Sequence, residues 1–367
     1  MTKLSAAQKT WLEGVFDSRF TDRPVERKLY SHDVGEMPSM IKPLIGTPMA
    51  EAVVQPASEA ELVALVQWAA QEGIPLTPRG KATSGYGGVL PVKGGIVVDF
   101  FRMDKVIAVD AAAQTATLEA GIVFEKADRE LKKHGFTLRT YPSSYPSATV
   151  GGWLAQGGAG FGALEAGWFR DNVVSARVVL GDGSLGLFEG DDLDMIYEAE
   201  GITGFITQLT IKVMPDVPLE IMSLGCAEAH SLQYMLEGFL ATDMPIWSMH
   251  FINPQMAKMK NQAPLQMHQG HPTEHRVLLP ETYIVTIAFR QQDADYVRSA
   301  IAARMTSPQC KAELLSDEIA QHEWAQRFRI MTVKRLGPSL VPAEVVVPLA
   351  GLGATLTEIA QKVGQPV

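Results

Sequence analysis

Three glycine-rich segments, each placed between a predicted strand and the element after it, constrain this chain most. They lie in Pro75–Phe100, Pro142–Gly167 and Ala199–Pro215, and each carries small hydroxyl side chains such as Thr83 and Thr149. Uncovered backbone N–H groups beside hydroxyl donors form a concave site for a phosphate. Tight turns are the alternative explanation, because glycine adopts positive φ at little cost. We favour phosphate binding, although neither a Walker loop nor the Rossmann fingerprint occurs.

Length and charge limit the class of protein. A chain of 367 residues can bury two cores. The net charge of −9 and the lack of a basic patch argue against a nucleic-acid partner. No apolar run approaches the roughly 20 residues that span a bilayer, and the start lacks the apolar core of a secretory signal. Cys226 and Cys310 are too few for a disulfide framework or an iron–sulfur site within the chain, so we expect a cytoplasmic setting.

Local signals predict the elements up to about residue 217. Ser58 and Glu61 have the spacing of a capping box, and Gly73 ends the amphipathic helix that follows. The run 181–183, Gly-Asp-Gly, predicts a tight hairpin. No βαβ repeat of equal period is present, so we expect an α+β unit and not a doubly wound sheet.

A second domain is expected beyond residue 217. Residues 219–305 read as strand, helix, strand, strand and helix, which predicts a ferredoxin-like α/β layer with antiparallel strands. The final "LTEIAQKVGQPV" repeats the helix and glycine of "LVQWAAQEGIPL" but stops before a strand. We therefore expect this domain to be incomplete, and later sequence or a partner subunit to supply a further strand.

The segments "PRGKATSGYGG", "PSATVGGWLAQGGAG" and "EGITGFITQLTIKVMP" resemble the FAD-binding segments of the vanillyl-alcohol oxidase / p-cresol methylhydroxylase flavoproteins. Within this family the segments resemble the branch of the glycolate oxidase flavin subunit and the D-lactate or D-2-hydroxyglutarate dehydrogenases. The resemblance implies an N-terminal helix and arm (1–45), a two-subdomain FAD-binding domain of the PCMH type (46–217) and a substrate or cap domain (218–367).

The resemblance also assigns the cofactor contacts. In such flavoproteins the first segment wraps the FAD diphosphate, the second passes the flavin ring and diphosphate, and the third meets the adenine end. The matching residues are Pro78, Arg79, Gly80, Lys81, Ala82, Thr83, Ser84, Gly85, Pro142, Ser143, Ser147, Thr149, Gly151, Gly152, Gly158, Glu200, Gly201 and Ile206.

Three departures from the family pattern qualify this assignment. Lys81 and Ala82 stand where glycine is common, so Lys81 can add a positive contact to phosphate. The first segment has no histidine or cysteine, so we expect non-covalent FAD. The His-Gly-Asp-Gly-Asn segment that helps bind the 2-hydroxy acid and a metal in this branch does not occur.

The candidate substrate-binding and metal-binding residues lie beyond residue 217. The W-x-x-R spacing of Trp324 and Arg327 resembles a family segment with a substrate-facing arginine, and a solvated helix face is the alternative. His268, His271 and His275, with Glu274, have the spacing of a metal site. We interpret them as surface histidines in a loop and predict no metal. His250 is interpreted as a satisfied polar residue.

The resemblance implies a dehydrogenase that transfers a hydride from a small 2-hydroxy acid, such as lactate or glycolate, to flavin N5. Its electrons would pass to an iron–sulfur protein, a cytochrome or a quinone, so peripheral membrane attachment through a partner is possible. The alternative is an FAD-holding electron-transfer subunit or fragment of a larger flavin/iron–sulfur complex without a complete substrate site. A flavin-free structural relative is a third class, which the three intact segments disfavour.

Overall fold

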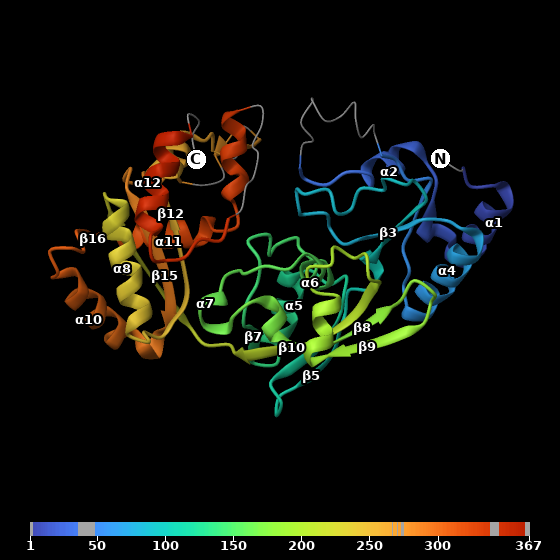
Figure 1. The fold of residues 1–367 in the computed structure, drawn as a ribbon, viewed down its shortest axis with the longest axis horizontal. Coiled ribbons are helices and arrows are strands. Elements are labelled where there is room, and N and C mark those ends of the chain that lie inside the picture. Colours follow the sequence, from blue (N-terminus) through green and yellow to red (C-terminus); the bar gives the residue numbers. More distant parts are fainter. Residues whose placement is uncertain are drawn as a thin grey trace. The chain divides into compact units, whose positions relative to one another are not determined.

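The computed structural model describes residues 3–35, 48–265, 267–269, 271–272, 275–337 and 345–363. The chain forms two compact units (Figure 1). Unit 1 comprises Met1–Gly160 and Ala166–Asp216, and unit 2 comprises Phe161–Glu165 and Val217–Val367. Five residues from the middle of the unit 1 sequence therefore belong to unit 2.

The first sheet of unit 1 has the strand order β1-β2-β4-β3, in which β2 and β3 pair parallel to β4 and β1 pairs antiparallel to β2. Its strands are β1 (Phe20–Thr21), β2 (Ala52–Val54), β3 (Leu76–Arg79) and β4 (Ile96–Asp99). The helical segments around it are α1 (Ala6–Phe16), η1 (Asp17–Arg19), α2 (Pro24–Leu29), α4 (Glu59–Glu72) and η2 (Phe100–Arg102). Part of the expected irregular arm is thus helix α2, and residues 36–47 lie outside the described residues.

Helix α4 begins and ends where its local signals predict. The Ser58 side chain accepts a hydrogen bond from the Glu61 backbone N–H (3.2 Å), and Gly73 ends the helix at φ 65°. The Glu61 carboxylate departs from the capping box, because it accepts from the Ala57 N–H and pairs with Arg19. The hydrogen bond from Arg19 is the main reason why the pKa of Glu61 lies below its usual value. Glu61 therefore ties the N-terminal segment to α4.

The second sheet of unit 1 is antiparallel, with the order β5-β6-β10-β8-β9 and with β7 also paired to β10. Its strands are β5 (Val106–Asp110), β6 (Thr115–Glu119), β7 (Phe136–Leu138), β8 (Val173–Val179), β9 (Leu185–Glu189) and β10 (Phe205–Pro215). The other helical segments in this part of the chain are α5 (Phe124–Lys132), α6 (Val150–Gln156), α7 (Ala163–Ala166), η3 (Phe169–Asn172) and η4 (Gly190–Met195). The predicted hairpin is present, because β8 and β9 pair on either side of residues 181–183.

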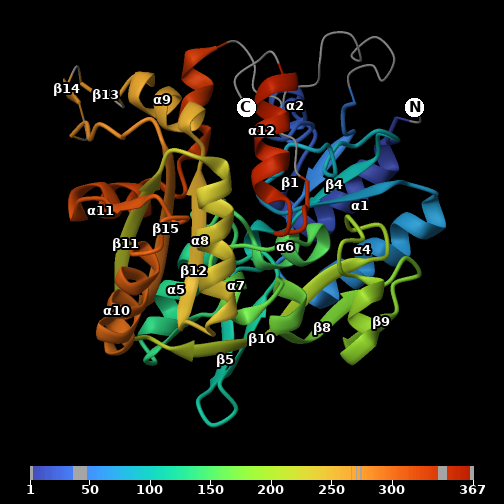
Figure 2. The same ribbon diagram turned by 60° about the vertical axis from the view of Figure 1, so that its left-hand side comes forward.

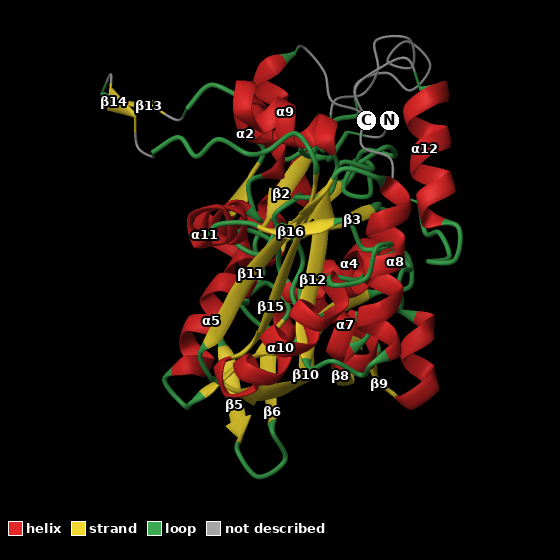
Figure 3. Cartoon of the chain, turned by 90° about the vertical axis from the view of Figure 1, so that its left-hand side faces the viewer, coloured by secondary structure: helices red, strands yellow, loops and turns green. Residues whose placement is uncertain are grey.

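Unit 2 is built on an antiparallel sheet of order β12-β15-β11-β16, whose long strands lie side by side in Figure 3. The strands of unit 2 are β11 (Leu219–Cys226), β12 (Ile246–Ile252), β13 (Met267–His268), β14 (His271–Pro272), β15 (Tyr283–Arg290) and β16 (Ala312–Leu314). Its helical segments are α8 (Ala229–Ala241), α9 (Pro254–Gln262), η5 (Gln291–Asp293), α10 (Ala294–Met305), α11 (Asp317–Gln326), η6 (Ile330–Leu336) and α12 (Leu352–Lys362).

The two faces of this sheet carry different clusters. On one face, apolar side chains of β11, β12 and β15 pack with α8 and α10, and Figure 2 shows α8 alongside the strands. On the other face, a smaller cluster joins Ile284 of β15 to Ala257 of α9 and Ile319 of α11. None of the helices in the described part of the chain is both long enough and apolar enough to cross a membrane.

Candidate functional site

The three glycine-rich segments converge in unit 1 just after β3. A methyl group on Gly80, in the first segment, would lie 2.3 Å from Oγ1 of Thr149 in the second. One on Gly88 would lie 2.6 Å from Oε2 of Glu200 in the third. Both distances are far below van der Waals contact, so the segments approach this closely only because glycine has no side chain.

Together the segments line a cavity with an empty volume of about 900 Å³, which we call the unit 1 cavity. Most of the predicted cofactor residues line it, namely Pro78, Arg79, Gly80, Lys81, Ala82, Thr83, Ser84, Thr149, Gly151, Gly152, Glu200, Gly201 and Ile206. The predicted residues absent from the described lining are Gly85, Pro142, Ser143, Ser147 and Gly158. Lining residues that the sequence did not predict are Asp33, Gly88, Val89, Phe100, Ala120, Ser144, Ala148, Trp153, Ala155, Gln156 and Gly204.

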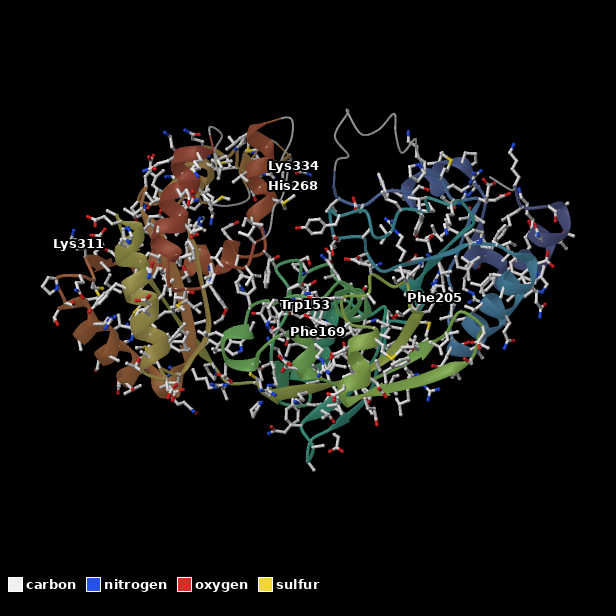
Figure 4. All side chains as sticks on the ribbon, in the orientation of Figure 1. Trp153, Phe169, Phe205, His268, Lys311 and Lys334 are labelled. Carbon is white, nitrogen blue, oxygen red and sulfur yellow. The ribbon has the colours of Figure 1, made fainter. Side chains whose placement is uncertain are left out.

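The second segment reaches the cavity through the start of α6. Thr149 is the N-cap of this helix, and its side chain accepts a hydrogen bond from the Gly152 N–H (3.2 Å). Trp153, one helical turn further on, stacks on Phe169 with ring centroids 4.4 Å apart. Figure 4 labels the two residues close together. Phe124 meets Trp153 edge-on at 5.3 Å. Buried aromatic packing therefore fixes the helix whose first turn forms one wall of the cavity.

The structure gives Arg79 a role that the sequence did not predict. Its Nη1 donates to the backbone carbonyls of His32 (2.8 Å) and Tyr30 (3.2 Å). The hydroxyl of Tyr30 donates to Asp99 (3.1 Å), which also accepts from Gln55 Nε2 (2.7 Å). Burial raises the pKa of Asp99 and lowers the pKa of Arg79. Arg79 lines the cavity, but its Nη1 is already hydrogen-bonded to the N-terminal arm at Tyr30 and His32.

Asp33 is the residue of the arm that holds the first segment. Its Oδ2 accepts from the Gly87 N–H (2.8 Å), and its Oδ1 accepts from the Gly35 N–H (2.8 Å). A methyl group on Gly35 would lie 2.4 Å from the Gly85 carbonyl oxygen, so arm and segment also touch through their backbones. No local pattern could have found Asp33, because its partner Gly87 lies 54 positions away in the chain.

Replacing Asp33 with alanine is expected to loosen the first segment. The variant loses the acceptor that orients the Gly87 N–H, worth about 1 kcal/mol. We expect about fivefold weaker flavin-nucleotide binding, measured as the dissociation constant of FAD by fluorescence titration. His32→Ala is the matched control, because its side chain is exposed and its carbonyl, which Arg79 binds, remains. An Asp33→Ala protein that binds FAD as tightly as the wild type would contradict this role.

Two charged side chains on the cavity wall differ in their surroundings. Lys81 is exposed, and its Nζ lies 4.1 Å above the centre of the Phe101 ring. The carboxyl of Glu200 is partly removed from water, and burial raises its pKa. The exposed ammonium suits a phosphate, whereas the carboxyl suits hydroxyl or amine donors of a nucleoside.

In unit 2, Arg327 follows the last turn of α11. Its guanidinium carbon lies 3.9 Å from the ring centre of Trp324, 4.1 Å from that of Phe328 and 5.7 Å from that of Phe161. Nη1 donates to the Trp324 carbonyl. The side chain is partly buried among aromatic rings.

The three clustered histidines lie at a short hairpin. His268 of β13 and His271 of β14 are paired directly, and His275 follows the hairpin. Glu274 lies outside the described residues. Within the described ranges, no group of three or more histidine, cysteine or acidic side chains is arranged to hold a metal ion.

Comparison with known families finds a match that covers part of unit 1. Residues 50–186 match the family model described as FAD binding domain. This part of the chain is an FAD-binding domain. The match runs from β2 to the first residues of β9 and so includes the first two glycine-rich segments. The cavity wall suits such a cofactor, since its lining includes Gly80, the hydroxyl residues Thr83 and Ser84, and the exposed Lys81.

Curated relatives agree with this family resemblance. Glycolate oxidase subunit GlcD of Bacillus subtilis (strain 168) is 23% identical over 357 residues, which cover 94% of this chain and 73% of the relative. D-lactate dehydrogenase of Anaerostipes hadrus is 29% identical over 221 residues, which cover 58% of this chain but 45% of the relative. A solved alkyldihydroxyacetonephosphate synthase has the same fold, with a TM-score of 0.76 at 20% identity, over 91% of this chain and 64% of that one. The chain thus spans less than two thirds of these last two proteins.

Proposed function

We propose that this flavoprotein is an FAD-dependent dehydrogenase that oxidises a small 2-hydroxy acid such as lactate or glycolate. The observation that carries the proposal is the convergence of three distant glycine-rich segments on one cavity of the FAD-binding domain. Relatives named as a glycolate oxidase subunit and a D-lactate dehydrogenase support the substrate class.

The residues of the unit 1 cavity would bind FAD without a covalent bond. Backbone N–H groups and small hydroxyl side chains of residues 80–84 suit the diphosphate, since these residues line the cavity. Glu200, Gly201 and Ile206 would meet the adenosine end. When bound, FAD supplies the acceptor for the hydride of the substrate.

Unit 2 would be the substrate domain, and Arg327 would bind the carboxylate of the 2-hydroxy acid. A guanidinium flanked by Trp324 and Phe328 is held in one orientation, which favours two parallel hydrogen bonds to a carboxylate. The order β12-β15-β11-β16, with α8 and α10 on one face, supports a ferredoxin-like cap. The electrons would leave to an iron–sulfur protein, a cytochrome or a quinone.

An anaerobic titration tests this function. We expect that D-lactate, glycolate or 2-hydroxyglutarate bleaches the flavin absorbance of the purified FAD-loaded protein, with dithionite as the positive control. If dithionite bleaches the flavin and none of the three acids does, the chain is instead an FAD-holding electron-transfer subunit without a complete substrate site. That alternative is favoured by the missing His-Gly-Asp-Gly-Asn segment.

Lys81→Ala tests the proposed phosphate contact. Loss of one exposed cation near a diphosphate is worth up to about 1 kcal/mol, so we expect up to about fivefold weaker FAD binding. The difference from the wild type should shrink at high salt, because screening shortens the range of the charge. Riboflavin, which has no phosphate, should bind both proteins equally. Lys93→Ala is the control, since Lys93 is also exposed and does not belong to the described lining.

A further inference from the structure

His250 lies on the face of the unit 2 sheet that α9 and α11 cover. Its neighbours in β12, Met249 and Phe251, pack against the cluster formed with α8 and α10. Successive side chains of a strand point to opposite faces, so His250 faces the other way. Its register partner is Thr286 of β15, whose hydroxyl is hydrogen-bonded to that of Ser223 at 2.8 Å. These three side chains form a polar row across the sheet.

Aromatic rings and cations surround this histidine. The Phe161 ring meets the imidazole edge-on at 5.3 Å, and the Trp324 ring lies 6.3 Å away. Trp324 also stacks on Arg327, the proposed carboxylate ligand, so the histidine and the arginine flank the same indole ring.

A buried ion pair joins the two covering helices. From α9, Lys260 Nζ contacts both carboxylate oxygens of Glu323 of α11, at 2.6 and 2.7 Å. His322 lies beside the same carboxylate, 3.8 Å away. The Glu323 carboxylate is therefore paired with Lys260. The charges that act on the pKa of His250 are the positive ones of Lys260 and Arg327.

The imidazole of His250 is neutral and lacks a partner at one nitrogen. Within the described part of the chain, Nδ1 is buried and forms no hydrogen bond. Burial, and then the charges of Lys260 and Arg327, lower the pKa of His250 to about 4. A buried N–H without an acceptor is rarer in proteins than a buried acceptor without a donor. The proton of the neutral ring therefore belongs on Nε2.

We propose that His250 is a second substrate-binding residue, which donates a hydrogen bond from Nε2 to an oxygen of a carboxylate-bearing substrate beside Arg327. This inference rests on the proposed role of unit 2 as the substrate domain. A neutral hydrogen-bond donor next to an arginine can bind an anion without adding a charge that titrates. The apolar ring of Phe161 lies beside both His250 and Arg327. The sequence interpretation of His250 as a satisfied polar residue is wrong, since nothing in the described structure pairs with its Nδ1.

Nitrogen-15 NMR of the labelled holoenzyme tests the protonation state, with His250→Gln identifying the signals. We expect the Nε2–H tautomer, uncharged, at about pH 6 to 8. A charged imidazolium at pH 7, or a proton on Nδ1, overturns the proposal.

Oxalate, a small carboxylate with no hydride to give, tests binding through the fluorescence of Trp324 and its neighbour Trp247. Losing a hydrogen bond to a charged ligand should weaken oxalate binding about 10- to 100-fold in His250→Leu. His250→Gln keeps an N–H donor and should recover most of the affinity. Lys258→Met is the control, because Lys258 is an exposed cation of the same helix α9.

The outcomes separate this inference from the proposed function. Wild-type protein that does not bind oxalate, or His250→Leu protein that binds it equally tightly, overturns the role of His250. Unchanged KM for D-lactate in His250→Leu does the same while leaving the dehydrogenase assignment intact. If oxalate binding depends on His250 but no 2-hydroxy acid bleaches the flavin, the carboxylate-binding role of His250 is supported and the proposed 2-hydroxy-acid oxidation is wrong.

Discussion

Gly80→Ala is expected to yield protein that loses its FAD during purification. The new methyl group would lie 2.3 Å from Thr149 Oγ1, so Thr149 has to leave the position from which it caps α6. Overpacking costs about 1–3 kcal/mol and the lost cap about 1 kcal/mol. When this free-energy cost destabilises the FAD-bound state, the dissociation constant of FAD rises about 100-fold. The measurement is the ratio of flavin absorbance to protein absorbance, followed by an FAD titration.

Two further variants show whether the contact of the new methyl group with Thr149 causes the loss of FAD. Gly14→Ala in helix α1 has no neighbouring heavy atom within 4 Å and should leave FAD binding unchanged. Adding Thr149→Ala to Gly80→Ala removes the atom that the methyl group meets, so it should restore part of the affinity. Non-additive effects of this kind are expected for residues in contact. If the double variant binds FAD no better than Gly80→Ala, the two segments do not meet as the structure shows.

Glu323→Gln is expected to destabilise unit 2 by about 3 kcal/mol. Its side chain is 2% exposed and that of Lys260 is 17% exposed, so the change leaves an ammonium largely out of water without its carboxylate. Breaking a buried pair from one side costs about 3–5 kcal/mol. For a unit of this size we expect the midpoint of thermal unfolding to fall by about 10 °C, measured by calorimetry. FAD binding by unit 1 should remain.

An exposed ion pair supplies the control for this prediction. Lys311 and Glu228 are 60% and 56% exposed, so Glu228→Gln should change the midpoint by no more than a few degrees. Replacing both buried partners, as Lys260→Met with Glu323→Leu, should recover most of the stability, because no charge is then left unpaired. Glu323→Gln protein that melts like the wild type would show that the pair is not buried in solution.

Those parts of the fold that depend on neighbouring residues could be predicted from the sequence. Helix α4 extends between Ser58 and Gly73 because a cap and a stop act over a few positions. The β8–β9 hairpin follows from glycine at 181 and 183 for the same reason. The short helix α2 was missed, although Pro24 at its start and Glu26 in its first turn are signals of a helix N-terminus.

The candidate site could be predicted only where a motif marks it. The resemblance assigned Gly80, Thr149 and Ile206, and the structure brings them to one cavity. The contact of Asp33 with Gly87 was not predicted, because it arises from tertiary folding. The structural partners of Arg79 were missed for the same reason, since they lie in the arm. No sequence pattern reports the unpaired nitrogen of His250.

The assignment of Phe161–Glu165 to unit 2 has a practical consequence for anyone who wishes to dissect the molecule. A cut after Asp216 would not produce two self-sufficient halves. The downstream fragment would lack the Phe161 ring that meets Trp324, Phe328 and His250. The upstream fragment would present that phenylalanine to solvent. Recombinant production should therefore keep the polypeptide whole, or graft the five-residue loop onto the downstream piece.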